Sequence, residues 1–410
     1  MEIEEQVDRI LAYGEICDHC LGRFFGKKSH GLANEERGHG LRVARALRVN
    51  TPFVPPSGPC WICHDLFAGI GTWAERVVQA LSGIEYSTFL IGTRVPPLMA
   101  ESEELVWSDL GLDGPEPLKS EMNREVGKVV SAITGRAADL ARPDVVAILD
   151  LARETVELEI SPLFFRGRYR KLERGIPQTR WPCRECHGAG CERCGFTGKM
   201  YPDSVEELVG RTAAGVFRAD DAVLHGAGRE DIDARMLGTG RPFVMEIVAP
   251  RRRVVDLAAL EERVNTAAAG RVGITIEGWS TRGEVETLKS EKAHKKYRIS
   301  VEIEGGIARK ELEEALDRLK GAVVSQQTPA RVVHRRADRI RERRVVDARV
   351  AGQEGGTFFL DVVGEAGLYV KELVSGDGGR TRPSLAGLVG RPARVVQLDV
   401  LEVEGSEERE

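Results

Sequence analysis

The cysteines of this 410-residue chain constrain its fold more than any other feature, because all eight fall into C-x-x-C pairs. The pairs are Cys17/Cys20, Cys60/Cys63, Cys183/Cys186 and Cys191/Cys194. Two cysteines three positions apart on a tight turn can share one metal ion, and two such turns supply four thiolates. A disulfide framework requires no such pairing. The spacing therefore predicts structural Zn²⁺, one or two ions per chain.

The first two pairs indicate a zinc-binding module over residues 1–66. A short helix with Val7, Ile10 and Leu11 on one face leads into the sequence C-D-H-C. A helical, arginine-rich stretch and a proline-rich turn, TPFVPPSGP, then lead into C-W-I-C. One metal ion can hold both turns together if the intervening helix is packed. The alternative interpretation is a set of reduced cysteines that only fill the core.

The other two pairs form a C-x-x-C-x4-C-x-x-C cluster at 183–194, with Gly188 and Gly190 inside it. This spacing predicts a compact site of four thiolates. A redox dithiol explains any single C-x-x-C, but a doubled pair favours metal. The cluster is also similar to the zinc repeats of J-domain co-chaperones. Those proteins repeat the unit and carry a His-Pro-Asp motif, and this sequence has neither.

The remaining sequence predicts two further domains, as expected for a chain longer than one core supports. Residues 67–165 have an α/β pattern without a catalytic constellation, which indicates a binding or spacer domain. Residues 166–410 predict a mixed sheet with helices on one side. Its clearest strand is KYRISVEIE, in which apolar and polar residues alternate. The apolar face consists of Tyr297, Ile299, Val301 and Ile303.

Charge and hydropathy favour a cytoplasmic protein with a confined basic surface. The acidic N-terminus is unlike a signal peptide, and no apolar run is long enough for a membrane-spanning helix. The net charge of −5 argues against a nucleic-acid partner. However, arginines are concentrated at 331–344 and 251–253. Either block alone is also compatible with an ordinary solvated surface.

The densest polar motif is GAGREDIDARMLGTGRPF at 226–243. Its glycines allow close approach of the backbone, and its acids and arginines could form a reactive site. It lacks the Lys-Ser/Thr pair of a phosphate-binding loop. Composition does not decide between Asp231 and Asp233, nor between a reactive site and a charged surface loop.

Three segments in order along the chain resemble the pseudouridine synthases. GREDIDARMLGTGRPF is similar to their catalytic loop, KKYRISV to the strand of their active-site tyrosine, and GLYVKELVSGDGGRT to a later Tyr-x-basic-x-Leu strand. With the N-terminal C-x-x-C pairs, GRYRKLERGIPQTRW and GDGGRTRPSL, the whole chain resembles the archaeal and eukaryotic tRNA pseudouridine-54/55 synthases. The resemblance implies an α+β multidomain fold. Its parts would be a zinc-binding module at 1–66, a THUMP-like RNA-binding domain at 67–165 and a catalytic domain at 166–410.

The resemblance also assigns residues. Asp231 matches the catalytic aspartate, and Tyr297 matches the tyrosine that contacts the target base. The other substrate-binding residues would be Arg229, Tyr369, Lys371 and Leu373. Positions 369, 371 and 373 would share one face of a strand. Lys371 would pair with Asp231, with Arg380 as the alternative basic partner.

The implied reaction converts uridine to pseudouridine at position 54, position 55 or both of the tRNA T-loop. The nucleotide must be flipped out of the stack, and an aromatic side chain can replace the lost stacking. The carboxylate acts either as a nucleophile at C1′ or as the base of an elimination. No organic cofactor, membrane or protein partner is implied. A non-catalytic zinc protein that binds RNA is the main alternative function.

Overall fold

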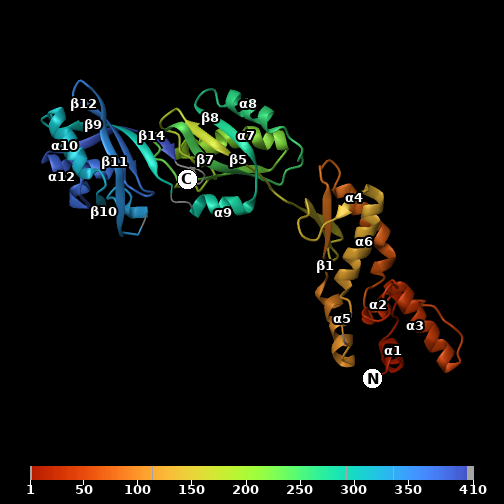
Figure 1. The fold of residues 1–410 in the computed structure, drawn as a ribbon. Coiled ribbons are helices and arrows are strands. Elements are labelled where there is room, and N and C mark those ends of the chain that lie inside the picture. Colours follow the sequence, from red (N-terminus) through yellow and green to blue (C-terminus); the bar gives the residue numbers. More distant parts are fainter. Residues whose placement is uncertain (1, 113, 291–292, 336, 404–410) are drawn as a thin grey trace. The chain divides into compact units, whose positions relative to one another are not determined.

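The structure is a computed structural model that describes residues 2–112, 114–290, 293–335 and 337–403. It consists of two compact units, Met1–Ser161 and Pro162–Glu410 (Figure 1). Among the described residues, no helix is both long and apolar enough to cross a membrane.

Unit 1 contains a four-stranded sheet in the order β2-β1-β3-β4. Strand β1 pairs in parallel with β2 and β3, and β4 is antiparallel to β3. The strands are β1 (Thr88–Arg94), β2 (Ala137–Ala138), β3 (Val145–Asp150) and β4 (Thr155–Ile160). The helices are α1 (Ile3–Leu11), α2 (Asp18–Phe24), α3 (Asn34–Val49), α4 (Ile70–Ala80), α5 (Pro97–Leu110) and α6 (Leu118–Thr134), with a 3₁₀ turn, η1, at Leu66–Gly69.

Helix α6 shows how the sequence determines this packing. Leu118, Met122, Val126 and Val130 recur every four positions, so they lie on one face of the helix, and all four are buried. Pro117 precedes the first turn, and Gly135 ends the helix in the left-handed region at φ +67°. The buried face belongs to the core that also contains the central strands of the sheet.

The same core includes the first cysteine cluster. Cys20, Cys60 and Cys63 are buried together with residues of α1, α2, α6 and the sheet. The segments expected as separate domains at 1–66 and 67–165 therefore lie in one compact unit. The boundaries between them stay predictions.

Unit 2 is built on a ten-stranded sheet in the order β13-β10-β11-β12-β9-β14-β7-β5-β8, with β6 paired to β7. The strands are β5 (Leu163–Lys171), β6 (Asp221–Gly226), β7 (Arg235–Val248), β8 (Val272–Ser280), β9 (Lys295–Ile303), β10 (Val323–Gln327), β11 (Ile340–Glu354), β12 (Thr357–Gly364), β13 (Thr381–Arg382) and β14 (Ala393–Val403). The helices are α7 (Val205–Phe217), α8 (Leu257–Ala267), α9 (Arg282–Ser290), α10 (Arg309–Leu319), α11 (Val370–Ser375) and α12 (Leu385–Val389), and 3₁₀ turns are η2 (Glu192–Cys194), η3 (Val333–Arg335) and η4 (Asp377–Gly379). Because β14 and β7 pair in parallel within an otherwise antiparallel sheet, the sheet is mixed, as predicted.

Strand β9 lies near the middle of this sheet and follows the predicted alternation. Tyr297, Ile299, Val301 and Ile303 are buried, whereas Arg298 on the opposite face is exposed and pairs with Asp361. The prediction of helices on one side of the sheet was incomplete. Helices α7 and α8 cover one face, but α9 lies on the other, where Val285 packs against Phe164 and Val244 (Figure 1).

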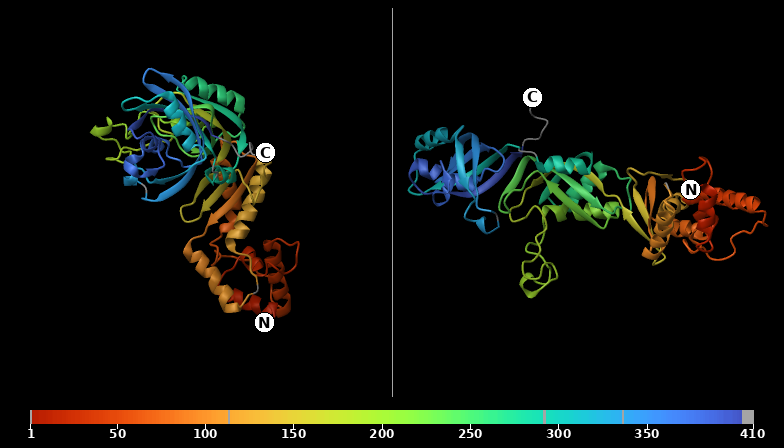
Figure 2. Two further views of the ribbon diagram at one scale, coloured as in Figure 1. Left: turned by 60° about the vertical axis from the view of Figure 1, so that its left-hand side comes forward. Right: turned by 90° about the horizontal axis from the view of Figure 1, so that it is seen from below.

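The second cysteine cluster lies on a loop between β5 and α7. Figure 2 shows this yellow-green loop standing off the body of unit 2. Two backbone hydrogen bonds close its base, Met200 N to Trp181 O at 2.9 Å and Cys183 N to Gly198 O at 2.7 Å. Gly198, at φ +71°, has no room for a side chain, because a Cβ would lie 2.3 Å from the carbonyl oxygen of Gly188.

Candidate active site

A cavity of about 580 Å³ opens in unit 2 between the loop that precedes β7, the start of β9 and the segment that leads into α11. Five of the six residues that the family resemblance assigned line it, namely Arg229, Asp231, Tyr297, Tyr369 and Lys371. Leu373 does not line the cavity, because its side chain is buried in the hydrophobic core of unit 2. The fold thus brings three motifs that are distant in the sequence together at one cavity.

Asp231 has two cationic neighbours and an open side. Arg331 Nη1 lies 3.3 Å and Lys371 Nζ 3.3 Å from the Asp231 carboxylate. The aspartate side chain is 38% exposed. Arg331 also pairs with Glu372 at 2.7 Å, which holds the guanidinium in place. The two ion pairs hold the Asp231 carboxylate in one orientation while its free side faces the cavity.

Asp233 shares one of these cations but is more exposed, with 70% of its side chain accessible. Lys371 Nζ approaches the two Asp233 oxygens at 2.9 and 2.7 Å, closer than it approaches Asp231. Partial burial raises the pKa of Asp233, but Lys371 outweighs that effect and the pKa lies below its ordinary value. Lys371 therefore connects both aspartates that the sequence left as alternatives.

Tyr297 lines the cavity and is only 8% exposed. Burial raises its pKa to about 12, with Arg241 opposing and Asp231 adding to the shift. The phenol is therefore protonated near neutral pH. A buried aromatic ring in a polar cavity can stack against a planar base.

The segment 367–373 corrects the sequence interpretation. Tyr369, Lys371 and Leu373 were expected on one face of a strand, but residues 370–375 form helix α11 and Tyr369 is its N-cap. In a helix, positions two apart point in different directions. This explains why Lys371 lines the cavity while Leu373 packs in the core. Gln326 fixes Tyr369 by accepting a hydrogen bond from its backbone nitrogen at 2.8 Å and donating one to its carbonyl oxygen at 2.9 Å.

The arginine block at 331–344 divides between the cavity and the surface. Arg331, Arg341 and Arg343 line the cavity, whereas position 336 lies outside the described residues. Arg380, the alternative partner of Asp231, instead pairs with Asp338 at 2.8 Å. Arg229 is exposed at the cavity and lies over the ring of Trp181, 5.9 Å from its centroid.

A buried polar cluster beneath Asp231 was missed in the sequence. The Glu230 carboxylate accepts hydrogen bonds from Tyr169 Oη at 2.8 Å and Arg241 Nε at 2.9 Å. Lys171 Nζ lies 3.6 Å from it and donates to the carbonyl oxygens of Ile176, Asp231 and Ile232 at 2.7 to 3.3 Å. The sequence did contain an indication of this cluster, because Lys171 occupies a core-facing position in the alternation of buried and exposed residues along β5. A lysine at such a position requires a buried partner.

Both cysteine clusters have the geometry of a zinc site. In each, the four Sγ atoms lie within 4.8 Å of one another. Zinc bound by four thiolates at ~2.3 Å has S···S edges of ~3.8 Å. Cys17 and Cys63 are separated by 3.6 Å, Cys183 and Cys191 by 3.9 Å, and Cys191 and Cys194 by 3.8 Å. All eight cysteines are free thiols, so the residues fit the metal.

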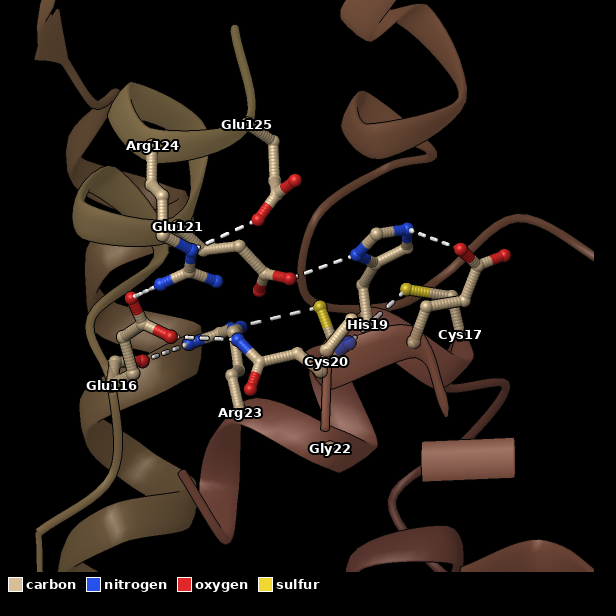
Figure 3. Close-up of polar contacts among 12 residues, drawn as sticks. Cys17, His19, Cys20, Gly22, Arg23, Glu116, Glu121, Arg124 and Glu125 are labelled. Carbon is tan, nitrogen blue, oxygen red and sulfur yellow. Dashed lines mark hydrogen bonds and ion pairs between the residues drawn. The ribbon is translucent and has the colours of Figure 1, made fainter. Parts of the chain in front are cut away.

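The first cluster is embedded in a polar network that joins α2 to α6 (Figure 3). Arg23, which is fully buried, lies with Nη2 3.6 Å from Cys20 Sγ and also pairs with Glu103. Glu103 accepts a hydrogen bond from the backbone nitrogen of Leu118, the first residue of α6, at 2.8 Å. His19 Nδ1 lies 2.8 Å from Glu121 Oε1 on the same helix. This network therefore connects helix α2, which carries Cys20, to helices α5 and α6.

Comparisons with known proteins cover nearly the whole chain. The family described as "Pus10, C-terminal" matches residues 164–404, and "Pus10 THUMP domain, archaeal" matches residues 73–150. Three relatives are each named tRNA pseudouridine synthase Pus10. That of Halorubrum lacusprofundi is 44% identical over 100% of this chain and 98% of its own length. Those of Methanothrix thermoacetophila and Pyrococcus furiosus are 45% and 38% identical, over 97% and 98% of this chain and 93% and 98% of their own lengths.

Proposed function

The chain belongs to the Pus10 family, and from this we propose that it converts uridine 54, uridine 55 or both in the T-loop of tRNA to pseudouridine at the Asp231 cavity. It is a tRNA pseudouridine synthase, and therefore an isomerase, as the resemblance of its motifs predicted. The predicted α+β fold with a THUMP domain is also confirmed. The alternatives of a non-catalytic RNA-binding protein and a co-chaperone are wrong. The reaction is expected in the cytoplasm, where the protein would meet its tRNA.

The reaction only rearranges bonds within one nucleotide. The N1–C1′ bond breaks and its electron pair stays with the uracil. The base turns, C5 bonds to C1′, the proton on C5 leaves and N1 takes one up. Atoms and charge balance without a redox partner, so the proposal requires no organic cofactor.

One observation carries the assignment of Asp231. Its carboxylate lies between Arg331 and Lys371 and faces a cavity that also contains a buried tyrosine. In one route the carboxylate attacks C1′ and forms an ester that C5 of the turned base displaces. In the other it removes a proton from C2′, and the proton is returned when C5 bonds to C1′. Both routes use the carboxylate that Arg331 and Lys371 hold in place.

The other predicted residues would hold the flipped nucleotide. We assign stacking on the base to Tyr297, whose ring is fixed in the wall of the cavity. Tyr369 and Arg229 would contact the nucleotide or its neighbours at the cavity edge, while Lys371 orients Asp231. Leu373 would act indirectly, by packing the helix that carries Lys371.

Phosphate contacts would come from the arginines around the cavity, and the THUMP domain would add binding surface for the same tRNA. Structural zinc would be held by Cys17, Cys20, Cys60 and Cys63 in unit 1 and by Cys183, Cys186, Cys191 and Cys194 in unit 2. Its chemistry would be purely structural, because four thiolates leave no open coordination position.

The test is pseudouridine mapping in unmodified tRNA transcripts treated with the purified protein. We expect product in the T-loop of wild-type transcript. Replacing uridine 54 or uridine 55 by cytidine, one at a time, should remove product only at the replaced position. A matched reaction with Asp231→Asn should give none. Absence of T-loop product with wild-type protein, or product with Asp231→Asn, would contradict the proposal.

A further inference from the structure

Arg331 and Lys371 flank Asp231, but other cationic side chains also line the cavity. Lys295 is one of these. It is the first residue of β9 and lies on the same strand face as Tyr297, two positions away. Both side chains line the cavity. Lys296, between them, points to the opposite face, on the side of Arg298 and Asp361. Strand β9 therefore places the Lys295 ammonium group beside the Tyr297 ring, to which we assign stacking on the base.

The surroundings of Lys295 do not neutralise it. Among the described residues, the structure gives its ammonium no hydrogen bond and no ion pair. The carboxylate whose charge acts on Lys295 is that of Glu230, which already binds Tyr169, Arg241 and Lys171. Burial, reinforced by the charge of Arg241 and opposed by Glu230, lowers the pKa of Lys295 to about 8. A partly buried cation without a partner costs free energy, and such a cost is common where a ligand supplies the missing charge.

The backbone around this ammonium is adapted to it. Gly228, at φ +76°, adjoins the Asp231 loop, and a Cβ there would lie 3.0 Å from Lys295 Nζ and 3.3 Å from Arg241 Nη1. Glycine thus keeps space between the loop and the ammonium. Lys295 is consequently held next to the loop that carries the reactive carboxylate.

The proposed reaction creates negative charge on the base. When the N1–C1′ bond breaks, its electron pair spreads from N1 over O2 and O4 of the uracil. A preorganised cation where this charge develops can contribute about 10²–10³-fold in rate, the effect of one oxyanion donor. The cations beside Asp231 are already engaged, Arg331 with Asp231 and Glu372, and Lys371 with Asp231 and Asp233.

We propose that Lys295 stabilises the departing uracil anion by donating a hydrogen bond to a carbonyl oxygen of the flipped base. This inference rests on the proposed function and adds a catalytic residue to it. Lys295 keeps its proton throughout. The electron pair that leaves the N1–C1′ bond forms the C5–C1′ bond after the base has turned, and the interaction with Lys295 weakens as the charge disappears.

The test compares two leaving groups in single-turnover reactions with Lys295→Met. One tRNA transcript contains uridine and the other 5-fluorouridine, and the consumption of each nucleoside is measured in nuclease digests. Fluorine withdraws electrons and stabilises the anion, so the reaction depends less on Lys295. We expect Lys295→Met to slow the uridine reaction by about 10²–10³-fold. The reduction with 5-fluorouridine should be at least tenfold smaller, and the Kd for tRNA should stay within about threefold of wild type.

Lys296→Met is the matched control, because it removes an identical charge from the next position on the opposite face. It should leave both rates near wild type, and Lys295→Arg should restore part of the uridine rate. Equal rate reductions of Lys295→Met with both transcripts, or a main effect on tRNA affinity, would overturn the inference and indicate a structural or phosphate-binding role. If wild-type protein and Lys295→Met are equally active, the inference alone fails. If wild-type protein makes no T-loop pseudouridine, the proposed function fails instead.

Discussion

Glu230 and Asp231 are adjacent in the chain, yet their carboxylates lie in opposite environments: the Glu230 side chain is 0% exposed and that of Asp231 is 38% exposed. The Glu230 carboxylate contacts Tyr169, Arg241 and Lys171. Lys171 also binds the carbonyl oxygen of Asp231 at 3.2 Å. The buried residue therefore fixes the backbone from which the exposed one reaches into the cavity.

Replacing Glu230 by Gln should reduce both stability and turnover. The change leaves Lys171 and Arg241 buried without their counter-charge, which costs about 3–5 kcal/mol of unfolding free energy. Burial raises the pKa of Glu230, but Arg241 and Lys171 outweigh it and the pKa lies below its ordinary value. Its stabilisation is thus present above the unfolded pKa of ~4.3 and is lost as pH falls below it. Chemical unfolding would measure the destabilisation, and kcat should fall more than KM rises.

Glu302→Gln is the control, because Glu302 forms an exposed pair with Arg394 whose removal should cost at most about 1 kcal/mol. Equal stability of the Glu230 and Glu302 variants would contradict the role given to the buried cluster.

Asp231→Asn should abolish detectable pseudouridine while tRNA affinity stays within a few-fold of wild type. The amide keeps the size and most hydrogen bonds of the side chain but removes its charge. Asp233→Asn should retain activity with a reduced rate, because Lys371 then loses one of its two carboxylate partners. Product formation and filter binding would measure the two effects. An active Asp231→Asn beside an inactive Asp233→Asn would reverse the assignment.

The rate of the chemical step should fall as pH rises through about 8, the value to which the pKa of Lys295 is lowered. The sign follows from the proposed role, since only the protonated amine carries the positive charge that stabilises the uracil anion. The ionisable groups facing Lys295 are Arg241 on β7 and Glu230 before it, and Tyr297, with its pKa raised to about 12, stays neutral over this range. In Lys295→Arg the decline should move to higher pH. Single-turnover rates between pH 6 and 10 would measure both profiles, and an unchanged profile in Lys295→Arg would contradict the prediction.

The sequence predicted the parts of this structure that depend on local patterns. The alternation around Tyr297 gave β9 and its buried face, and the C-x-x-C spacing gave both cysteine clusters. Motif resemblance gave the residues that meet at the cavity, although it placed Tyr369 and Lys371 on a strand instead of at the start of α11. That segment is short, and tertiary contacts such as those of Gln326 decide its conformation.

The parts that were missed depend on contacts between distant segments. Arg331 was noted only as one of many arginines. It contacts Asp231 although the two residues are 100 positions apart in the chain. Lys171, Glu230 and Arg241 come from β5, a loop and β7, and nothing in their spacing shows that they are buried together. Local periodicity reports which face of an element is apolar, but it does not report which elements become neighbours.

Metal analysis of the purified protein should approach two zinc ions per chain, because both clusters have four thiolates at the spacing of a tetrahedral site. Cys20→Ser should reduce solubility before it affects chemistry, since Cys20 is buried in the core of unit 1 and contacts Arg23. Cys186→Ser should be tolerated better, because its loop stands off the sheet (Figure 2). A ratio near one zinc would mean that one cluster, expected to be the second, does not hold zinc.

The arginines around the cavity and Tyr297 should respond differently to salt. Arg341 and Arg343 line the cavity from β11, and we expect them to neutralise phosphates of the tRNA backbone. The Arg341→Gln/Arg343→Gln variant should weaken binding of cognate and unrelated tRNAs alike, because phosphate contacts do not specify sequence. The slope of log Kd against log salt should flatten by about one unit for each phosphate that the variant no longer neutralises. Tyr297→Ala should instead lose turnover with little change in slope, because stacking on one flipped base releases few ions. Binding assays from low to high salt would separate the two behaviours. Unchanged binding of the double variant at every salt concentration would show that these arginines only line the cavity and do not hold the RNA.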